Sequence, residues 1–244
     1  METANLGSVL SRFAVDERVS APLAIDELRA EKLALIERLG SADSLRDFGG
    51  LWGVHGLYLL EGARALGCSF AEMIDASPVD EFLSKCRELQ EEHAVQINML
   101  EADFRSPALF EVLRPVEVAL LYDVLLHQDT VASVVKGVTQ TTLRHVLVAQ
   151  PVLKEELFQL PSAAVNLQFY RDELKAELRS GTWWPEEERV TRFDTGKWMW
   201  GQTPSYLESL FAGYGWRREH LQLNDLGRYW NYGFMRFAPG PGVE

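Results

Sequence analysis

Short apolar runs alternate with amphipathic stretches along most of the chain. The run VEVALLYDVLLH is typical of a central strand that is buried on both faces. The apolar runs lie in residues 44–50, 69–77, 94–104, 116–127 and 144–153. Between them, apolar residues recur at helical spacing in residues 56–67, 78–93 and 130–143. Strands that alternate with helices predict an α/β fold with a doubly wound, parallel sheet.

The start of the chain and one internal segment depart from this alternation. Residues 1–40 carry helical periodicity ahead of the first strand and predict an N-terminal extension that serves as a lid. Residues 154–202 break the rhythm with helical and aromatic stretches, which predicts a cap that binds substrate. Residues 203–240 resume with a helix and two strands, joined closely enough for an antiparallel hairpin. The expected core therefore comprises residues 41–153 and 203–240.

The composition narrows the class of partner. The 244 residues carry a formal net charge of −12 without a basic stripe, which argues against nucleic acid and anionic membranes. Residues 1–13 lack the basic start and long apolar core of a signal peptide, and no apolar run is long enough to span a bilayer. We expect a cytoplasmic protein with Cys68 and Cys86 as buried free thiols and no metal site. The sequence leaves a homodimer open.

A glycine-bearing turn follows the first expected strand, and an acid ends the second. The turn is DFGGLWG, residues 47–53, and the acid is Asp75. In α/β proteins the glycines of such a turn let the backbone approach an adenosine-type ligand, and the acid accepts hydrogen bonds from two ribose hydroxyls. This pair predicts a ligand held across the carboxyl ends of the first two strands.

Over the expected core, these features resemble the class I S-adenosylmethionine-dependent methyltransferases, which have a Rossmann-like fold. That family has a doubly wound, seven-stranded and mostly parallel sheet that ends antiparallel, which matches the C-terminal hairpin expected here. Its first motif, D/E-x-G-x-G-x-G, is matched by Asp47, Gly49 and Gly53, with Leu51 in place of the middle glycine. A Cβ at residue 51 is expected to crowd a ligand that approaches closely.

The resemblance implies a cofactor site at the ends of four strands. Asp103 and Phe104, after the third strand, would meet the adenine, with the carboxylate accepting its amine and the ring packing on its face. Tyr122 and Asp123, after the fourth strand, would border the methionine part. The implied cofactor-binding residues are Asp47, Gly49, Gly53, Asp75, Asp103, Phe104 and Tyr122.

Candidates for catalysis and acceptor binding come from the fourth strand and the insertion. Histidine is suited to proton transfer near neutral pH, so His127 is the leading general base, with Asp123 positioning it or the substrate. The alternative for His127 is a capping or structural role. The aromatic residues of the insertion predict a lining for a flat or cationic acceptor, or else the core of a small cap. They are Tyr170, Trp183, Trp184, Trp198 and Trp200.

The resemblance thus implies a transferase of secondary metabolism that moves a methyl group from S-adenosylmethionine to an oxygen, nitrogen or carbon of a small aromatic or apolar metabolite. Three alternatives stay open: a non-catalytic S-adenosylmethionine-binding or regulatory protein, an RNA-modifying methyltransferase, and a nicotinamide-dependent oxidoreductase. The spacing after Gly49 does not match G-x-G-x-x-G, and the sequence has no Tyr-x-x-x-Lys dyad, which disfavours the oxidoreductase.

Overall fold

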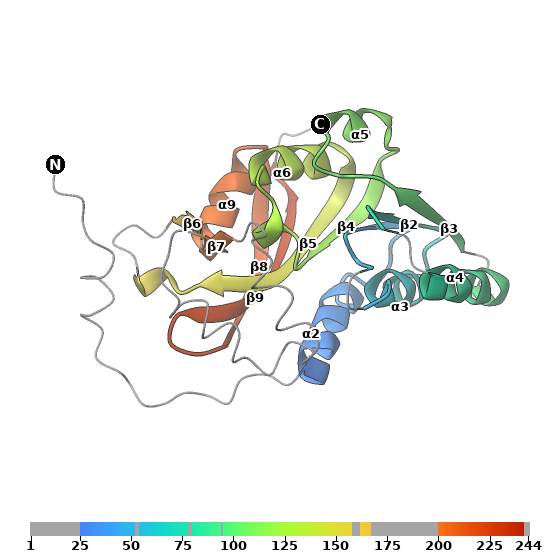
Figure 1. Cartoon of the computed structure of the whole chain (residues 1–244), viewed down its shortest axis with the longest axis horizontal. Helices are drawn as coiled ribbons and strands as arrows, with labels where there is room; N and C mark the ends of the chain where they lie inside the picture. The colour runs from blue at the N-terminus through green and yellow to red at the C-terminus, as the bar shows by residue number, and fades with distance from the viewer. Residues whose placement is uncertain are drawn as a thin grey trace.

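A computed structural model describes residues 25–51, 54–77, 80–93, 95–157, 162–166 and 200–241. Within these ranges the chain forms a seven-stranded sheet of order β3-β2-β1-β4-β5-β9-β8 (Figure 1). Its strands are β1 (Ser44–Phe48), β2 (Phe70–Asp75), β3 (Gln96–Glu101), β4 (Val116–Tyr122), β5 (Thr142–Leu153), β8 (Trp216–Asp225) and β9 (Trp230–Pro239). The pairs from β3 to β5 are parallel, whereas β9 is antiparallel to both β5 and β8. The predicted sheet and its C-terminal hairpin are therefore confirmed.

Helices cover both faces of this sheet (Figure 1). One face carries α2 (Ile25–Glu37), α3 (Leu57–Leu66) and α4 (Asp80–His93), and the other carries α5 (Pro107–Val112), α6 (Val131–Gln140) and α9 (Pro204–Ala212). Each face has its own apolar cluster, with leucines of α2 and α3 on the first and valines of α6 on the second. Cys68 and Cys86 are buried free thiols, as expected, and burial raises their pKa to about 12 and about 11.

Some short elements were not foreseen. The six-residue helix α5 occupies the loop between β3 and β4, and a 3₁₀ turn, η1 (Leu125–His127), follows β4. At the start of the insertion, the described residues form a 3₁₀ turn, η2 (Glu155–Leu157), and the rest of the helical stretch expected there lies outside the described residues. Two further strands, β6 (Ala164–Asn166) and β7 (Trp200–Gln202), pair antiparallel as a separate small sheet. These two strands bring residues 164–166 and 200–202 together.

Strand order places acids at one edge of the sheet. β1 lies between β2 and β4, and all three are parallel, so their carboxyl ends meet at the same edge. Asp47 is the penultimate residue of β1, Asp75 ends β2 and Asp123 directly follows β4. Ligands of open α/β sheets bind in the crevice outside this edge, where the strand order reverses. The fold therefore places three carboxylates where a ligand is expected.

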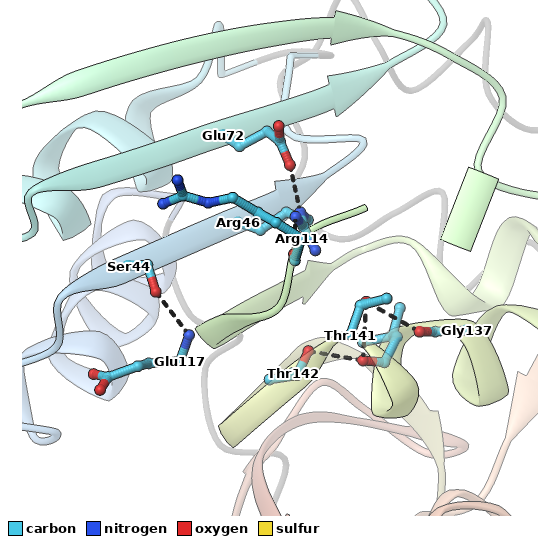
Figure 2. A network of polar contacts seen from close by, with 9 residues as sticks. Ser44, Arg46, Glu72, Arg114, Glu117, Gly137, Thr141 and Thr142 are labelled. Carbon is cyan, nitrogen blue, oxygen red and sulfur yellow. Dashed lines mark hydrogen bonds and ion pairs between the residues drawn. The ribbon is translucent and has the colours of Figure 1, made fainter. Parts of the chain in front are cut away.

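A buried polar network ties β1 to β2 within the sheet (Figure 2). Arg46 is fully buried, and its Nε donates to Oε2 of Glu72 at 2.7 Å. Its Nη2 donates to the carbonyl oxygen of Arg114 at 2.7 Å, in the loop before β4. A guanidinium removed from water needs such partners, because an unpaired buried charge is strongly destabilising. This network therefore holds the central strands, and the acids at their ends, in register.

Truncating Glu72 to alanine is expected to lower the free energy of unfolding by about 3 kcal/mol, because the Arg46 guanidinium loses its buried counter-ion. Chemical denaturation with urea measures the change. The matched control is Glu61→Ala, which removes a partner of Arg64 in an exposed ion pair on α3. That variant is expected to unfold at almost the wild-type denaturant concentration. Equal midpoints for the two variants would contradict a supporting role for the buried pair.

Candidate active site

The glycine turn after β1 and the acid at the end of β2 contact one another directly. Gly49 has φ +74°, a left-handed conformation that favours glycine, and its N–H donates to the carbonyl oxygen of Ile74 at 2.8 Å. One carboxylate oxygen of Asp75 accepts from the N–H of Leu51 at 3.2 Å, and the other accepts from the N–H of Ser77 at 3.2 Å. The turn and the acid thus form one wall at the edge of the sheet where a ligand is expected. Asp75 itself remains partly exposed.

Leu51 does not project into this wall. Its side chain is 1% exposed and packs in the apolar cluster beneath α2 and α3, while its backbone N–H faces Asp75. Close backbone approach is instead required one residue earlier, at Gly50. A Cβ on Gly50 would overlap the carboxylate of Asp47. The glycine displaced by one position from the motif is therefore the one that accommodates the acid.

Asp47 is a buried acid whose side chain makes no hydrogen bond within the described part of the chain. It is 1% exposed, and neither of its carboxylate oxygens has a partner among those residues. Burial, followed by the charge of Asp75, raises the pKa of Asp47 to about 7, although Lys32 acts in the opposite direction. Buried polar groups are nearly always hydrogen-bonded, so an orphaned carboxylate beside a crevice marks a place for a donor or a cation.

The loop after β3 contributes an aromatic ring, Phe104, and an acid, Asp103, that is already ion-paired. Phe104 packs edge-on against Phe48 with ring centroids 5.8 Å apart, and a Cβ on Gly49 would lie 3.5 Å from the Phe104 ring. Asp103 next to it is ion-paired with Arg105 at 2.6 Å. Hydrogen bonds from Arg105 lower the pKa of Asp103 below its ordinary value. The structure thus brings Phe104 to the glycine turn and directs the Asp103 carboxylate toward Arg105.

The end of β4 is tied to helix α2. Tyr122 is buried, and its hydroxyl donates to the carbonyl oxygen of Lys32 at 3.0 Å. Asp123 has φ +56°, which is uncommon for a residue other than glycine. Its carboxylate receives the Lys32 Nζ at 2.6 Å and the Tyr232 hydroxyl at 2.7 Å. The two residues expected at the methionine part are therefore anchored to α2 and β9.

His127 and Trp200 lie on adjoining elements. His127 ends η1, which packs against β5 and β7, and it is partly buried. Trp200 begins β7, is half-buried and packs against the apolar cluster on the α6 side. The other expected site residues, Gly53, Tyr170, Trp183, Trp184 and Trp198, lie outside the described residues, as do residues 1–24 of the expected lid.

Sequence reasoning missed the cation of this site. Lys32 is 4% exposed, and its Nζ lies 5.0 Å from the ring centroid of Tyr58 and 5.5 Å from that of Tyr232. The available signal was its helical position. Leu28 and Ile36, four residues on either side, are buried on the same face of α2. A lysine at a core position of an amphipathic helix could thus have been identified as a buried charge.

No protein-family model matches the sequence, and no curated protein matches it either. Solved structures do resemble the fold. An O-methyltransferase family protein from Burkholderia thailandensis aligns with TM-score 0.55 and 14% identity over 89% of this chain and 57% of that protein. Magnesium protoporphyrin IX methyltransferase from Synechocystis PCC 6803, with bound SAH, aligns with TM-score 0.58 and 12% identity over 88% of this chain and 85% of that one. The fold is that of the class I S-adenosylmethionine-dependent methyltransferases.

A third methyltransferase structure carries both ligands of its reaction. The 1,6-didemethyltoxoflavin-N1-methyltransferase from Burkholderia thailandensis, with bound 1,6-didemethyltoxoflavin and S-adenosylhomocysteine, aligns with TM-score 0.56 and 14% identity. The match covers 87% of this chain and 78% of that protein. In this chain, β1, β2 and β4 end at one edge of the sheet. Its glycine turn and three acids lie at that edge.

Proposed function

We propose that this protein is an S-adenosylmethionine-dependent methyltransferase that acts on a small metabolite. The observation that carries the proposal is the contact between Asp75 and the N–H of Leu51, which joins the acid ending β2 to the glycine turn after β1. A crevice bounded by a glycine turn and an acid suits a ligand with an adenosine part. The methyltransferase fold of the chain supports the same cofactor.

The residues at the crevice fit the chemistry of this cofactor. Asp75 would accept hydrogen bonds from the two ribose hydroxyls, and its negative charge would strengthen these bonds. Asp47 has two buried oxygens without partners, and an ammonium group would satisfy them. Phe104 would pack on the adenine beside Gly49, where its ring already borders the turn. We also retain Gly53, Asp103 and Tyr122 as proposed cofactor-binding residues.

The bound cofactor would supply a methyl group on a cationic sulfur, ready for displacement. The protein's own task is to hold the acceptor atom in line with that methyl group and to exclude water. Such positioning is worth about 7–11 kcal/mol of barrier in favourable systems. His127 would remove a proton from an acceptor that arrives protonated, because an imidazole can serve as a general base. Asp123 would fix the end of β4 beside it, held by Lys32 and Tyr232.

We place the acceptor under the insertion, beside η1 and β7. Trp200 would contribute an aromatic surface there, together with Tyr170, Trp183, Trp184 and Trp198. This arrangement favours an aromatic or otherwise apolar metabolite, methylated on oxygen, nitrogen or carbon. No helix among the described residues is long and apolar enough to cross a bilayer. We propose the cytoplasm as the site of action, and a homodimer stays a prediction.

Cofactor selectivity tests the proposal directly. At a free concentration one hundred times Kd, S-adenosylmethionine or S-adenosylhomocysteine is expected to raise the thermal midpoint by about 5–10 °C. NAD⁺ at the same concentration is expected to leave it unchanged. Calorimetric titration then gives each affinity. Stabilisation by NAD⁺ alone would refute the proposal, and binding of S-adenosylmethionine without demethylated product over a broad acceptor panel would favour a regulatory protein.

A further inference from the structure

Lys32 is a buried cation enclosed by groups from three other elements. Its Nζ meets the Asp123 carboxylate at 2.6 Å and lies 5.0–5.8 Å from the ring centroids of Tyr58, Tyr122 and Tyr232. These groups come from α3, from β4 and the residue after it, and from β9. Burial of an ammonium costs several kcal/mol unless charges and hydrogen bonds compensate for it. The carboxylate and three aromatic faces provide that compensation.

The ion pair also fixes the backbone at the mouth of the crevice. Asp123 adopts a left-handed conformation, which a residue other than glycine keeps only when its surroundings enforce it. Here the enforcement comes from both carboxylate oxygens, which are engaged by Lys32 and Tyr232. The Tyr122 hydroxyl fastens the backbone of α2 at the same residue, Lys32. Helix α2 is thereby attached at the point where β4 ends.

The three carboxylates at this edge repel one another, and the positive charge of Lys32 offsets this repulsion. The charge of Asp75, from β2, opposes ionisation of Asp47. The buried Tyr122, from β4, interacts electrostatically with Asp47. Lys32, from α2, favours the charged form of Asp47. Without a cation nearby, a buried acid next to a second acid holds its proton. A protonated Asp47 would present a poor partner to the ammonium end of the cofactor.

We propose that Lys32 is a positioning residue of the cofactor site: it anchors helix α2 at the end of β4 and fixes the Asp123 backbone, which would border the methionine part of the cofactor. The inference rests on the proposed function, since it assigns Lys32 to the same site. It differs from a purely structural ion pair in one respect. A structural pair affects folding alone, whereas a positioning pair also affects cofactor binding, and the Lys32 charge adds to that effect where Asp47 titrates.

The test compares Lys32→Gln, which keeps a donor for Asp123 but removes the charge, with Lys32→Arg, which keeps the charge. Calorimetric titration with S-adenosylmethionine between pH 5.5 and 9 is the readout. For Lys32→Gln the midpoint of binding is expected to move to higher pH. If that midpoint moves by one pH unit, about five times less carboxylate is ionised at pH 7, so we expect the loss of affinity relative to wild type to be about fivefold larger at pH 7 than at pH 9. Lys32→Arg is expected to keep the wild-type midpoint.

Lys136→Gln is the matched control, because Lys136 is exposed on α6, on the opposite face of the sheet. A carbon-13 titration of the Asp47 carboxyl group in the ligand-free protein measures the same effect without cofactor. An unchanged titration and an unchanged binding profile in Lys32→Gln would overturn the inference while the proposed function stands. A wild-type protein that binds no S-adenosylmethionine would instead overturn the proposed function, and this inference with it.

If Lys32→Gln does not fold, Tyr232→Phe tests the positioning directly. This variant removes the hydroxyl that holds Asp123 at 2.7 Å and changes no charge. It is expected to weaken binding of S-adenosylmethionine about threefold at all pH values, since Asp123 and Lys32 are then less well fixed. Wild-type affinity in a folded Tyr232→Phe protein would overturn the inference.

Discussion

Replacing Asp75 with alanine is expected to weaken binding of S-adenosylmethionine at least about a hundredfold while the fold is retained. Two hydrogen bonds from ribose hydroxyls to a charged acceptor are worth about 3 kcal/mol or more together, which corresponds to a hundredfold change in Kd. Asp75 is partly exposed, and within the protein it accepts from the backbone N–H groups of Leu51 and Ser77. Its loss therefore affects the loop after β1 more than the sheet.

Two further variants separate the charge from the hydrogen bonds. Asp75→Asn keeps an acceptor oxygen and is expected to retain part of the affinity that alanine loses. Glu88→Ala removes an exposed acid from α4 and is expected to bind like the wild type. Calorimetry gives the affinities, and circular dichroism reports whether each variant is folded. If Asp75→Ala bound the cofactor as tightly as Glu88→Ala does, Asp75 would not belong to the site.

Hydrophobic pattern was sufficient to predict the strands at the centre of the large sheet, because β1, β2, β4 and β5 are largely buried between helices on both faces. The run around β4 is almost continuously apolar, as a central parallel strand requires. The number of strands and the antiparallel end of the sheet followed from the resemblance to methyltransferases, whereas the strand order was not predicted. Helix α5 was missed because six residues give too little periodicity to recognise.

Some features of the candidate site could likewise be predicted from the sequence, and others could not. The contact of Asp75 with the glycine turn was predictable, because parallel strands that are neighbours end at the same edge. The burial of Leu51 and the role of Gly50 were not, since a one-residue shift within a turn depends on how its side chains pack. Lys32 was missed for another reason. A lysine on an amphipathic helix is normally solvated, and its partners Asp123 and Tyr232 lie far away in sequence.

Asp47→Asn is expected to change stability and cofactor affinity in opposite directions. Because the pKa of Asp47 in the folded protein, about 7, is above the unfolded value of 3.8, the folded state binds the proton more tightly. The contribution of Asp47 to stability is therefore greatest below about pH 4 and is lost as the pH rises to about 7. Asparagine has no charge to bury, so at pH 9 the variant is expected to gain about 1–3 kcal/mol in free energy of unfolding.

The same substitution removes the charge that would receive the cofactor's ammonium group, so affinity for S-adenosylmethionine is expected to fall at least about tenfold. Urea unfolding at pH 4, 7 and 9 measures the stability difference, which should be small at pH 4 and largest at pH 9. A variant that is less stable than the wild type at pH 9 would contradict a buried, strained charge at Asp47. A more stable variant that binds poorly would show that this acid is kept at the edge of the sheet for its ligand, because its charge opposes folding.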